Sequence, residues 1–119
     1  MATIDLFHKE DQYDPFKRGQ VIFREGDPPG SVMYVVYEGE VELRIHDKTV
    51  ETLGPGGVLG EMALIDKEPR SATAIAKTDC KLVPIDERRF NFLVQQTPNF
   101  ALQMMRVISA RLRKMDANL

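Results

Sequence analysis

Short apolar runs alternate with turns containing glycine or proline over residues 16–84. Within this stretch, Val41, Leu43 and Ile45 are apolar and the residues between them are polar. This period of two places one face of a strand against a core and the other in water. Turns recur at intervals of roughly 8–12 residues, which is typical of all-β barrels and sandwiches. We expect strands at residues 20–23, 31–37, 41–45, 50–53, 72–77 and 80–85.

The pattern changes at Asp86, after which helical periods replace strand alternation. Residues 87–96 are predicted to form a short helix with Asp86 as its N-cap. Pro98 would separate this helix from the next, because proline is tolerated only in a helix's first turn. A longer helix is expected over residues 100–115, whereas residues 1–13 are expected to form an arm or an irregular first strand.

The long helix carries two apolar strips. The strip with heptad spacing comprises Ala101, Met105, Ile108, Leu112, Met115 and Leu119. The other strip comprises Phe100, Met104 and Val107. Two strips favour two partners, the β domain and a second copy of the helix, so we expect a homodimer; the alternative is a helix packed only on its own domain. Four basic residues are predicted to form a solvated face of this helix: Arg106, Arg111, Arg113 and Lys114.

Composition narrows the classes of function. The chain has 119 residues, which suits a single domain, and a net charge of -2, which provides no basic field for nucleic acid or membrane. The single cysteine, Cys80, can form neither an internal disulfide nor a thiolate metal site, and is predicted to be a small core residue. No window approaches the ~18 apolar residues of a membrane span, and residues 1–10 lack the apolar run of a signal peptide. We expect a cytoplasmic protein with no metal, cofactor or membrane partner.

The segment from residue 60 to residue 74 fits neither a hairpin nor a long helix. Helix-forming residues 61–64 follow a glycine, and a single helical turn there would direct free N–H groups at an anion. Arg70 lies between Pro69 and small residues, and its guanidinium suits a phosphate. Glu61 could accept hydrogen bonds from a sugar hydroxyl, so the segment could hold a ribose phosphate. The alternative is a surface loop in which Glu61 and Arg70 pair with each other.

This segment resembles the phosphate-binding cassette of cyclic-nucleotide-binding domains. That family includes regulatory subunits of cAMP-dependent kinase, cyclic-nucleotide-gated channels and bacterial catabolite activators. The residues in register with the cassette are Gly60, Glu61, Ala63, Leu64, Pro69, Arg70, Ser71, Ala72 and Thr73, and residues 23–27, 38–41 and 53–56 are similar to flanking signatures. The resemblance implies one domain over residues 1–119. Its fold would be mainly β: a double-stranded β-helix, or jelly-roll-like (cupin-like) β-roll, at about residues 14–85, followed by a short and a long helix at about 87–116.

The resemblance also implies roles for single residues. Arg70 would bind an equatorial phosphate oxygen, Glu61 the ribose 2′-hydroxyl, and Ser71 the phosphate through its hydroxyl or amide. An apolar residue such as Val58 or Leu59 would support the purine. The other cassette residues expected to bind the nucleotide, through close backbone approach and amides, are Gly60, Met62, Ala63 and Ala72.

The chain departs from the catabolite activators near its end. Those activators contact the purine through hydroxyl residues late in the long helix, where this chain has Met115 and Asp116. Asp116 could accept a hydrogen bond from an exocyclic amine, so both positions are candidate base contacts. The activators continue into a helix-turn-helix domain, whereas this chain ends at Leu119. We therefore expect a stand-alone sensor with no DNA partner.

Taken together, these features predict a regulatory module that binds a cyclic nucleotide and moves its C-terminal helices in response. Ser71 after the arginine favours cAMP over cGMP, as in the bacterial activators, although a hydroxyl there accompanies cGMP preference in cGMP kinases. No Ser–His pair or cluster of metal ligands suggests catalysis, so no enzyme and no catalytic residue are expected. The alternative is a β-roll that has lost its ligand and serves as a structural or protein-interaction domain.

Overall fold

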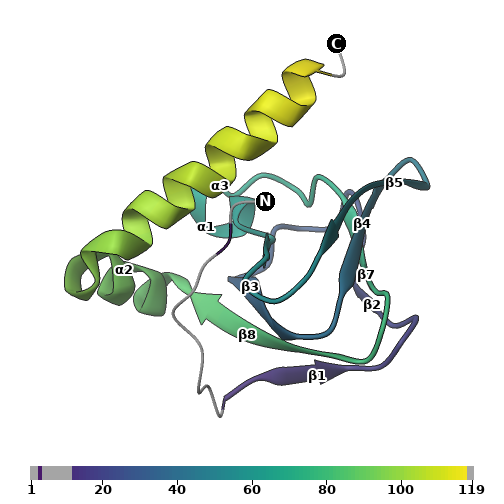
Figure 1. The fold of residues 1–119 in the computed structure, drawn as a ribbon, viewed down its shortest axis with the longest axis horizontal. Helices are drawn as coiled ribbons and strands as arrows, with labels where there is room; N and C mark the ends of the chain where they lie inside the picture. The colour runs from purple at the N-terminus through teal and green to yellow at the C-terminus, as the bar shows by residue number, and fades with distance from the viewer. Residues whose placement is uncertain (1–2, 4–11, 118–119) are drawn as a thin grey trace.

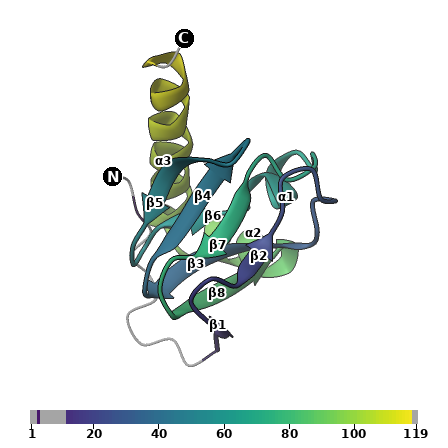
Figure 2. The ribbon, with the colours of Figure 1, turned by 90° about the vertical axis from the view of Figure 1, so that its right-hand side faces the viewer.

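Two four-stranded sheets form the body of the protein in the computed structural model, which describes residue 3 and residues 12–117 (Figure 1). All strand pairs are antiparallel. The first sheet has the order β1 (Asp14–Phe16), β8 (Cys80–Asp86), β3 (Val32–Glu38) and β6 (Val58–Leu59). The second has the order β2 (Val21–Phe23), β7 (Thr73–Ala76), β4 (Val41–Ile45) and β5 (Lys48–Leu53). In Figure 2 this sheet lies toward the viewer.

Apolar side chains fill both the space between the sheets and the space under the helices. Strand β3 serves both, because its residues alternate: Val36 lies in the core between the sheets, whereas Met33 and Val35 lie in the core beneath the helices. Cys80 is buried between the sheets, which confirms the prediction of a small core residue. The mainly β fold with C-terminal helices is therefore as predicted.

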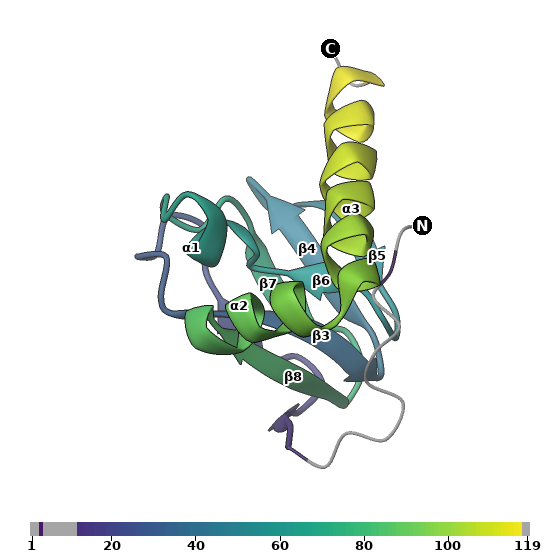
Figure 3. The same ribbon diagram turned by 90° about the vertical axis from the view of Figure 1, so that its left-hand side faces the viewer.

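Two consecutive helices cover the first sheet (Figure 3). Helix α2 (Glu87–Gln96) has the predicted bounds, and its N-cap Asp86 accepts a hydrogen bond from the Arg89 amide at 2.8 Å. Helix α3 (Pro98–Ala117) starts two residues earlier than predicted, because Pro98 occupies the first helical position, where its missing N–H costs no hydrogen bond.

The two apolar strips of α3 have different surroundings. Phe100, Met104 and Val107 are buried against the first sheet, and the Phe100 ring contacts Phe90 of α2 edge-on. In the heptad strip, Met105 is 64% exposed and Leu112 is 56% exposed. One strip thus packs on the β domain as predicted. The other is exposed at Met105 and Leu112 and half-buried at Ala101 and Ile108, while dimerisation stays a prediction.

Most strands lie within two residues of their predicted positions, and the differences are at turns and short strands. Between β4 and β5, His46 and Asp47 both have positive φ, which is typical of a two-residue type I′ turn, so β5 begins at Lys48. Strands β1 and β6 and the one-turn helix α1 (Met62–Ile65) complete the elements described. The predicted arm at residues 1–13 lies almost wholly outside the described residues.

Candidate functional site

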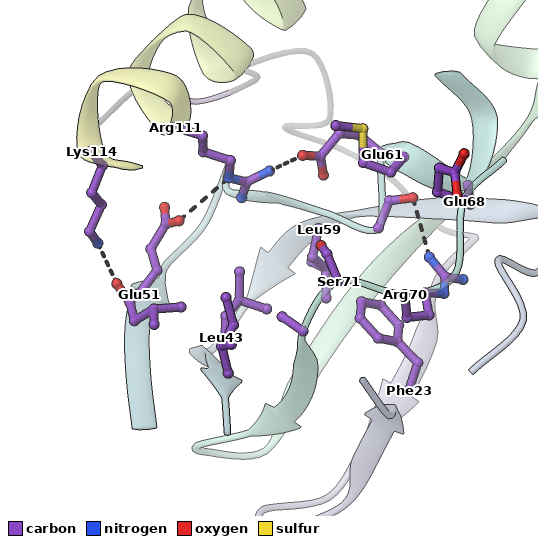
Figure 4. A pocket seen from close by; sticks show the side chains of 16 residues that line it. Phe23, Leu43, Glu51, Leu59, Glu61, Glu68, Arg70, Ser71, Arg111 and Lys114 are labelled. Carbon is purple, nitrogen blue, oxygen red and sulfur yellow. Dashed lines mark hydrogen bonds and ion pairs between the residues drawn. The ribbon is translucent and has the colours of Figure 1, made fainter. Parts of the chain in front are cut away.

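A cavity of about 350 Å³ opens between strands β4 and β5, the segment around α1, and helix α3 (Figure 4). Ligand pockets commonly measure about 300–1,000 Å³. All seven residues of the predicted cassette site line this cavity: Gly60, Glu61, Met62, Ala63, Arg70, Ser71 and Ala72. Leu59 lines it as well, whereas Val58 lies in the core beneath the helices. The side chains of Met115 and Asp116 lie outside the described part of the chain, so their predicted base contact stays a prediction.

The backbone of Arg70 is anchored to the turn after β2. Its amide donates to the carbonyl of Asp27 and its carbonyl accepts from the amide of Gly26, both at 2.8 Å. Its guanidinium donates to two further carbonyls, that of Gly60 at 3.2 Å and that of Val32 at 3.3 Å. Contacts from three separate segments therefore hold the arginine at the cavity wall.

Close packing completes the seat of the guanidinium. The Arg70 Cζ atom lies 4.2 Å from the ring centroid of Phe23, a cation–π arrangement. Gly30 and Gly60 approach from other directions with φ of +72° and +73°. A Cβ on Gly30 would lie 2.9 Å from Nη2, and one on Gly60 would overlap Nη1. Glycine suits both positions because it tolerates the positive φ and leaves the guanidinium in place.

Partial burial makes Arg70 receptive to an anion. Loss of solvent lowers the pKa of its guanidinium, and the nearby Tyr34, Asp27 and Glu61 act in the opposite direction. Arginine stays protonated at neutral pH in spite of such shifts. A phosphate placed against it would replace water that the guanidinium has lost, and the planar fork suits two phosphate oxygens.

Glu61 makes its ion pair with α3. This residue is only 8% exposed, and its Oε1 lies 2.7 Å from Nη1 of Arg111. The alternative in which Glu61 pairs with Arg70 on a surface loop is wrong, because the bonds of the Arg70 guanidinium run to carbonyls. A carboxylate has acceptor capacity for several hydrogen bonds, so Glu61 can hold Arg111 and also accept from a hydroxyl.

The prediction of a solvated basic face on α3 is wrong for Arg111. Its side chain is 20% exposed; Nε lies 3.4 Å from Oε1 of Glu51, and Nη2 donates to the carbonyl of Val58. Lys114, one turn further, donates to the carbonyl of Val50 and lines the cavity. Both residues bring α3 over the cavity mouth. Lys114 is nevertheless exposed, as are Arg106 and Arg113, so the prediction is wrong for Arg111 and holds for the other three residues.

The end of the cavity beyond Glu61 is apolar on one side. Leu43 and Ile45 of β4 and Val50 of β5 line it, with Glu51 and Lys114 at its edge. The amide of Ala63, predicted to bind ligand, donates to the carbonyl of Gly60 at 3.1 Å and so closes the turn into α1. The cavity therefore offers a cation, an acidic acceptor and an apolar wall in that order.

Neither a cluster of metal ligands nor a membrane-spanning helix is present in the part of the chain that the structure describes. There, no group of three or more histidine, cysteine, aspartate or glutamate residues is placed to hold a metal ion. Likewise, no described helix is both long enough and apolar enough to span a bilayer.

Comparison with known proteins gives the same family from sequence and from structure. The sequence profile described as "Cyclic nucleotide-binding domain" matches residues 13–97. The "Cyclic AMP receptor protein" of Thermus thermophilus is 34% identical over 121 residues, which cover 98% of this chain and 56% of that protein. A "cGMP-dependent protein kinase" of Toxoplasma gondii is 32% identical over 103 residues, which cover 84% of this chain and 10% of the kinase.

A solved structure supports the same assignment. The crystal structure of the Thermus thermophilus catabolite activator protein superposes with a TM-score of 0.79 at 33% identity, covering 90% of this chain and 52% of that chain. The predicted β-roll followed by helices is therefore confirmed. The chain spans about half the length of these bacterial relatives. With the family profile matching 13–97, this chain belongs to the cyclic nucleotide-binding domain family.

Proposed function

We propose that this protein is a cytoplasmic regulatory module that binds one cyclic nucleotide per chain, cAMP in preference to cGMP. The observation that carries the proposal is that Arg70 and Glu61 line one cavity whose far end is apolar. A cyclic phosphate would lie at Arg70 and Ser71, and the ribose 2′-hydroxyl would donate to Glu61. The base would extend toward Leu43 and the other apolar residues of that end.

Two considerations bear on the choice of nucleotide. The match over 98% of this chain to a protein named for cyclic AMP and the resemblance of Ser71 to the bacterial activators favour cAMP. The match to a cGMP-dependent kinase is shorter relative to this chain. The preference is therefore part of the proposal and needs its own measurement.

The expected response is a shift of α3. Arg111 links this helix to Glu61, so a ligand that bonds to Glu61 changes the free energy of the contact between cassette and helix. An effector, or a second copy of the chain joined through α3, would detect the shifted helix. The module itself would carry out no catalysis and needs no cofactor.

Calorimetric titration of the full 119-residue chain with cAMP and with cGMP tests the proposal. We expect saturable binding of one nucleotide per chain, with the lower Kd for cAMP. Tighter binding of cGMP would overturn the preference and leave the module assignment in place. Absence of binding by both would overturn the proposal in favour of a structural or protein-interaction domain.

A further inference from the structure

Glu51 presents a carboxylate at the end of the cavity farthest from the expected phosphate (Figure 4). It lies on β5 directly opposite Leu43 of β4, so both side chains lie on the face of the sheet that lines the cavity. Its side chain is only 12% exposed. A carboxylate so shielded from water gains from any N–H donor that enters the cavity.

Arg111 sets the position of this carboxylate relative to Glu61. Its Nη1 lies 2.7 Å from Glu61 Oε1 and its Nε lies 3.4 Å from Glu51 Oε1. Two carboxylates on one guanidinium are thus separated by about the width of that group. Each carboxylate has acceptor sites beyond those that the arginine fills. The pair therefore favours donor groups on a ligand.

The surroundings of Glu51 suit a flat ring. Ile45 and Val50 are each more than a third exposed although they are large and apolar, and both line the cavity beside Glu51. An aromatic ring over this wall would cover apolar surface and direct its edge at the carboxylate. A phosphate, which carries charge on every side, would gain nothing from this wall.

We propose that Glu51 reads the base by accepting a hydrogen bond from an exocyclic purine amine. This inference rests on the proposed function, because the ribose phosphate at Glu61 and Arg70 is what brings the ring to Glu51. Adenine offers the amine at N6 and guanine at N2. A carbonyl or bare ring nitrogen facing Glu51 would repel the carboxylate, so the residue selects for the amine.

Two pairs of nucleotides that differ only in the amine test the assignment. cAMP and the cyclic monophosphate of unsubstituted purine riboside differ only at N6, and cGMP and cyclic IMP differ only at N2. We expect the wild-type chain to bind the amine-bearing member at least about tenfold more tightly in one pair, the range of a hydrogen bond to a charged group. The pair that shows the preference identifies the base.

Substitutions of Glu51 distinguish its recognition of the base from its ion pair with Arg111. Glu51→Leu should reduce the preference within that pair to about onefold, and Glu51→Gln, which keeps an acceptor oxygen, should retain part of it. A loss of support for Arg111 alone would weaken both members equally and leave the ratio unchanged. Glu42→Gln is the matched control, because Glu42 lies on neighbouring β4, is bonded to Arg44 and Thr49, and is absent from the cavity lining.

The possible results are distinct. If the wild type binds the nucleotides but distinguishes neither pair, or if Glu51→Leu keeps the wild-type ratio, the role of Glu51 is overturned and the proposed function stands. If the wild type binds none of the four nucleotides, both fail. Should Glu51→Leu fold poorly, the ratio measured with Glu51→Gln decides, because an unchanged ratio there, with an unchanged Kd for both members, contradicts the assignment.

Discussion

The guanidinium of Arg111 lies 2.7 Å from the carboxylate of Glu61 and joins the last helix to the cassette. The two side chains are 20% and 10% exposed, so removing the arginine leaves a largely buried carboxylate without its counterion. We expect Arg111→Ala to lower the free energy of unfolding by ~1–3 kcal/mol, less than for a fully buried pair because some solvent reaches Arg111. Urea unfolding measures this, and exposed Arg106→Ala on the same helix should change little.

A double-mutant cycle tests whether the destabilisation comes from this pair. The change in unfolding free energy for Arg111→Ala combined with Glu61→Ala should be smaller than the sum of the two single changes. The difference is expected to be ~0.5–3 kcal/mol, as for residues in direct contact. Additive effects would contradict the coupling of α3 to the cassette through these two residues.

Arg70→Ala should weaken cAMP binding by more than about 30-fold. The reason is that removing one partner of a desolvated charge pair costs ~2–5 kcal/mol. The measurement is a calorimetric titration of a variant whose circular dichroism matches the wild type. Arg24→Ala serves as control, because Arg24 is exposed in the adjoining turn and does not line the cavity. Equal affinity in a folded Arg70→Ala variant would show that the phosphate does not bind there.

Glu61→Ala should affect ribose recognition more than phosphate recognition. The loss of one charge-assisted hydrogen bond is worth ~1.5–3 kcal/mol, so cAMP binding should weaken by less than in Arg70→Ala. The wild type should prefer cAMP to 2′-deoxy-cAMP, and the variant should bind the two with similar Kd. A preference that survives in the variant would assign the 2′-hydroxyl to another residue.

Gly30→Ala should weaken nucleotide binding although Gly30 does not line the cavity. An alanine Cβ would lie 2.9 Å from Nη2 of Arg70 and would displace the guanidinium. Gly26→Ala is a matched control, because Gly26 has a similarly positive φ of +86° but nothing within 4 Å of the built Cβ. Both variants should lose ~1–2 kcal/mol of stability from left-handed backbone. Only Gly30→Ala should raise the Kd for cAMP; equal Kd values in the two variants would contradict the steric role.

The cassette could be found from sequence because it is nearly contiguous. Gly60, Glu61 and Arg70 lie within eleven consecutive positions, and short-range spacing is what sequence reasoning detects. Glu51 and Arg111 reach the cavity from β5 and α3, and only the tertiary fold brings them together. Strands β1 and β6 were missed for a related reason: strands of three and two residues show no period, and they form by pairing with longer neighbours.

The sequence nevertheless contains a pattern that predicts a partly buried position for Arg111. The buried strip of α3 runs through Met104 and Val107, and the next positions on that face, four and three residues on, are Arg111 and Lys114. A basic residue that continues a buried strip must either end the contact or find acceptors within it. The carboxylates of Glu61 and Glu51 and the carbonyl of Val58 are such acceptors. Charge alone predicts a solvated face here, whereas position on the helix places Arg111 at the cavity.

The last prediction concerns the heptad strip of α3. Met105 and Leu112 are large apolar residues that are mostly exposed, are seven positions apart, and do not line the cavity. A second copy of α3 would cover them in a heptad contact. We therefore expect the chain to form a dimer in light scattering at high concentration, and Met105→Glu combined with Leu112→Glu to form a monomer that binds cAMP with unchanged Kd.

Two further variants test whether the heptad strip of α3 is the dimer interface. Phe92→Glu removes an equally exposed apolar residue from α2 and should leave the dimer intact, because Phe92 lies outside the heptad strip. A chain that ends at Ala110 should be monomeric and should bind cAMP more weakly as well, since it loses Leu112 from the strip and Arg111 from the cavity. A wild-type chain that is monomeric at high concentration would make the strip a solvent-facing surface only. A double variant that still dimerises would place the interface elsewhere, and the response to nucleotide would then have to leave the domain by a route other than paired helices.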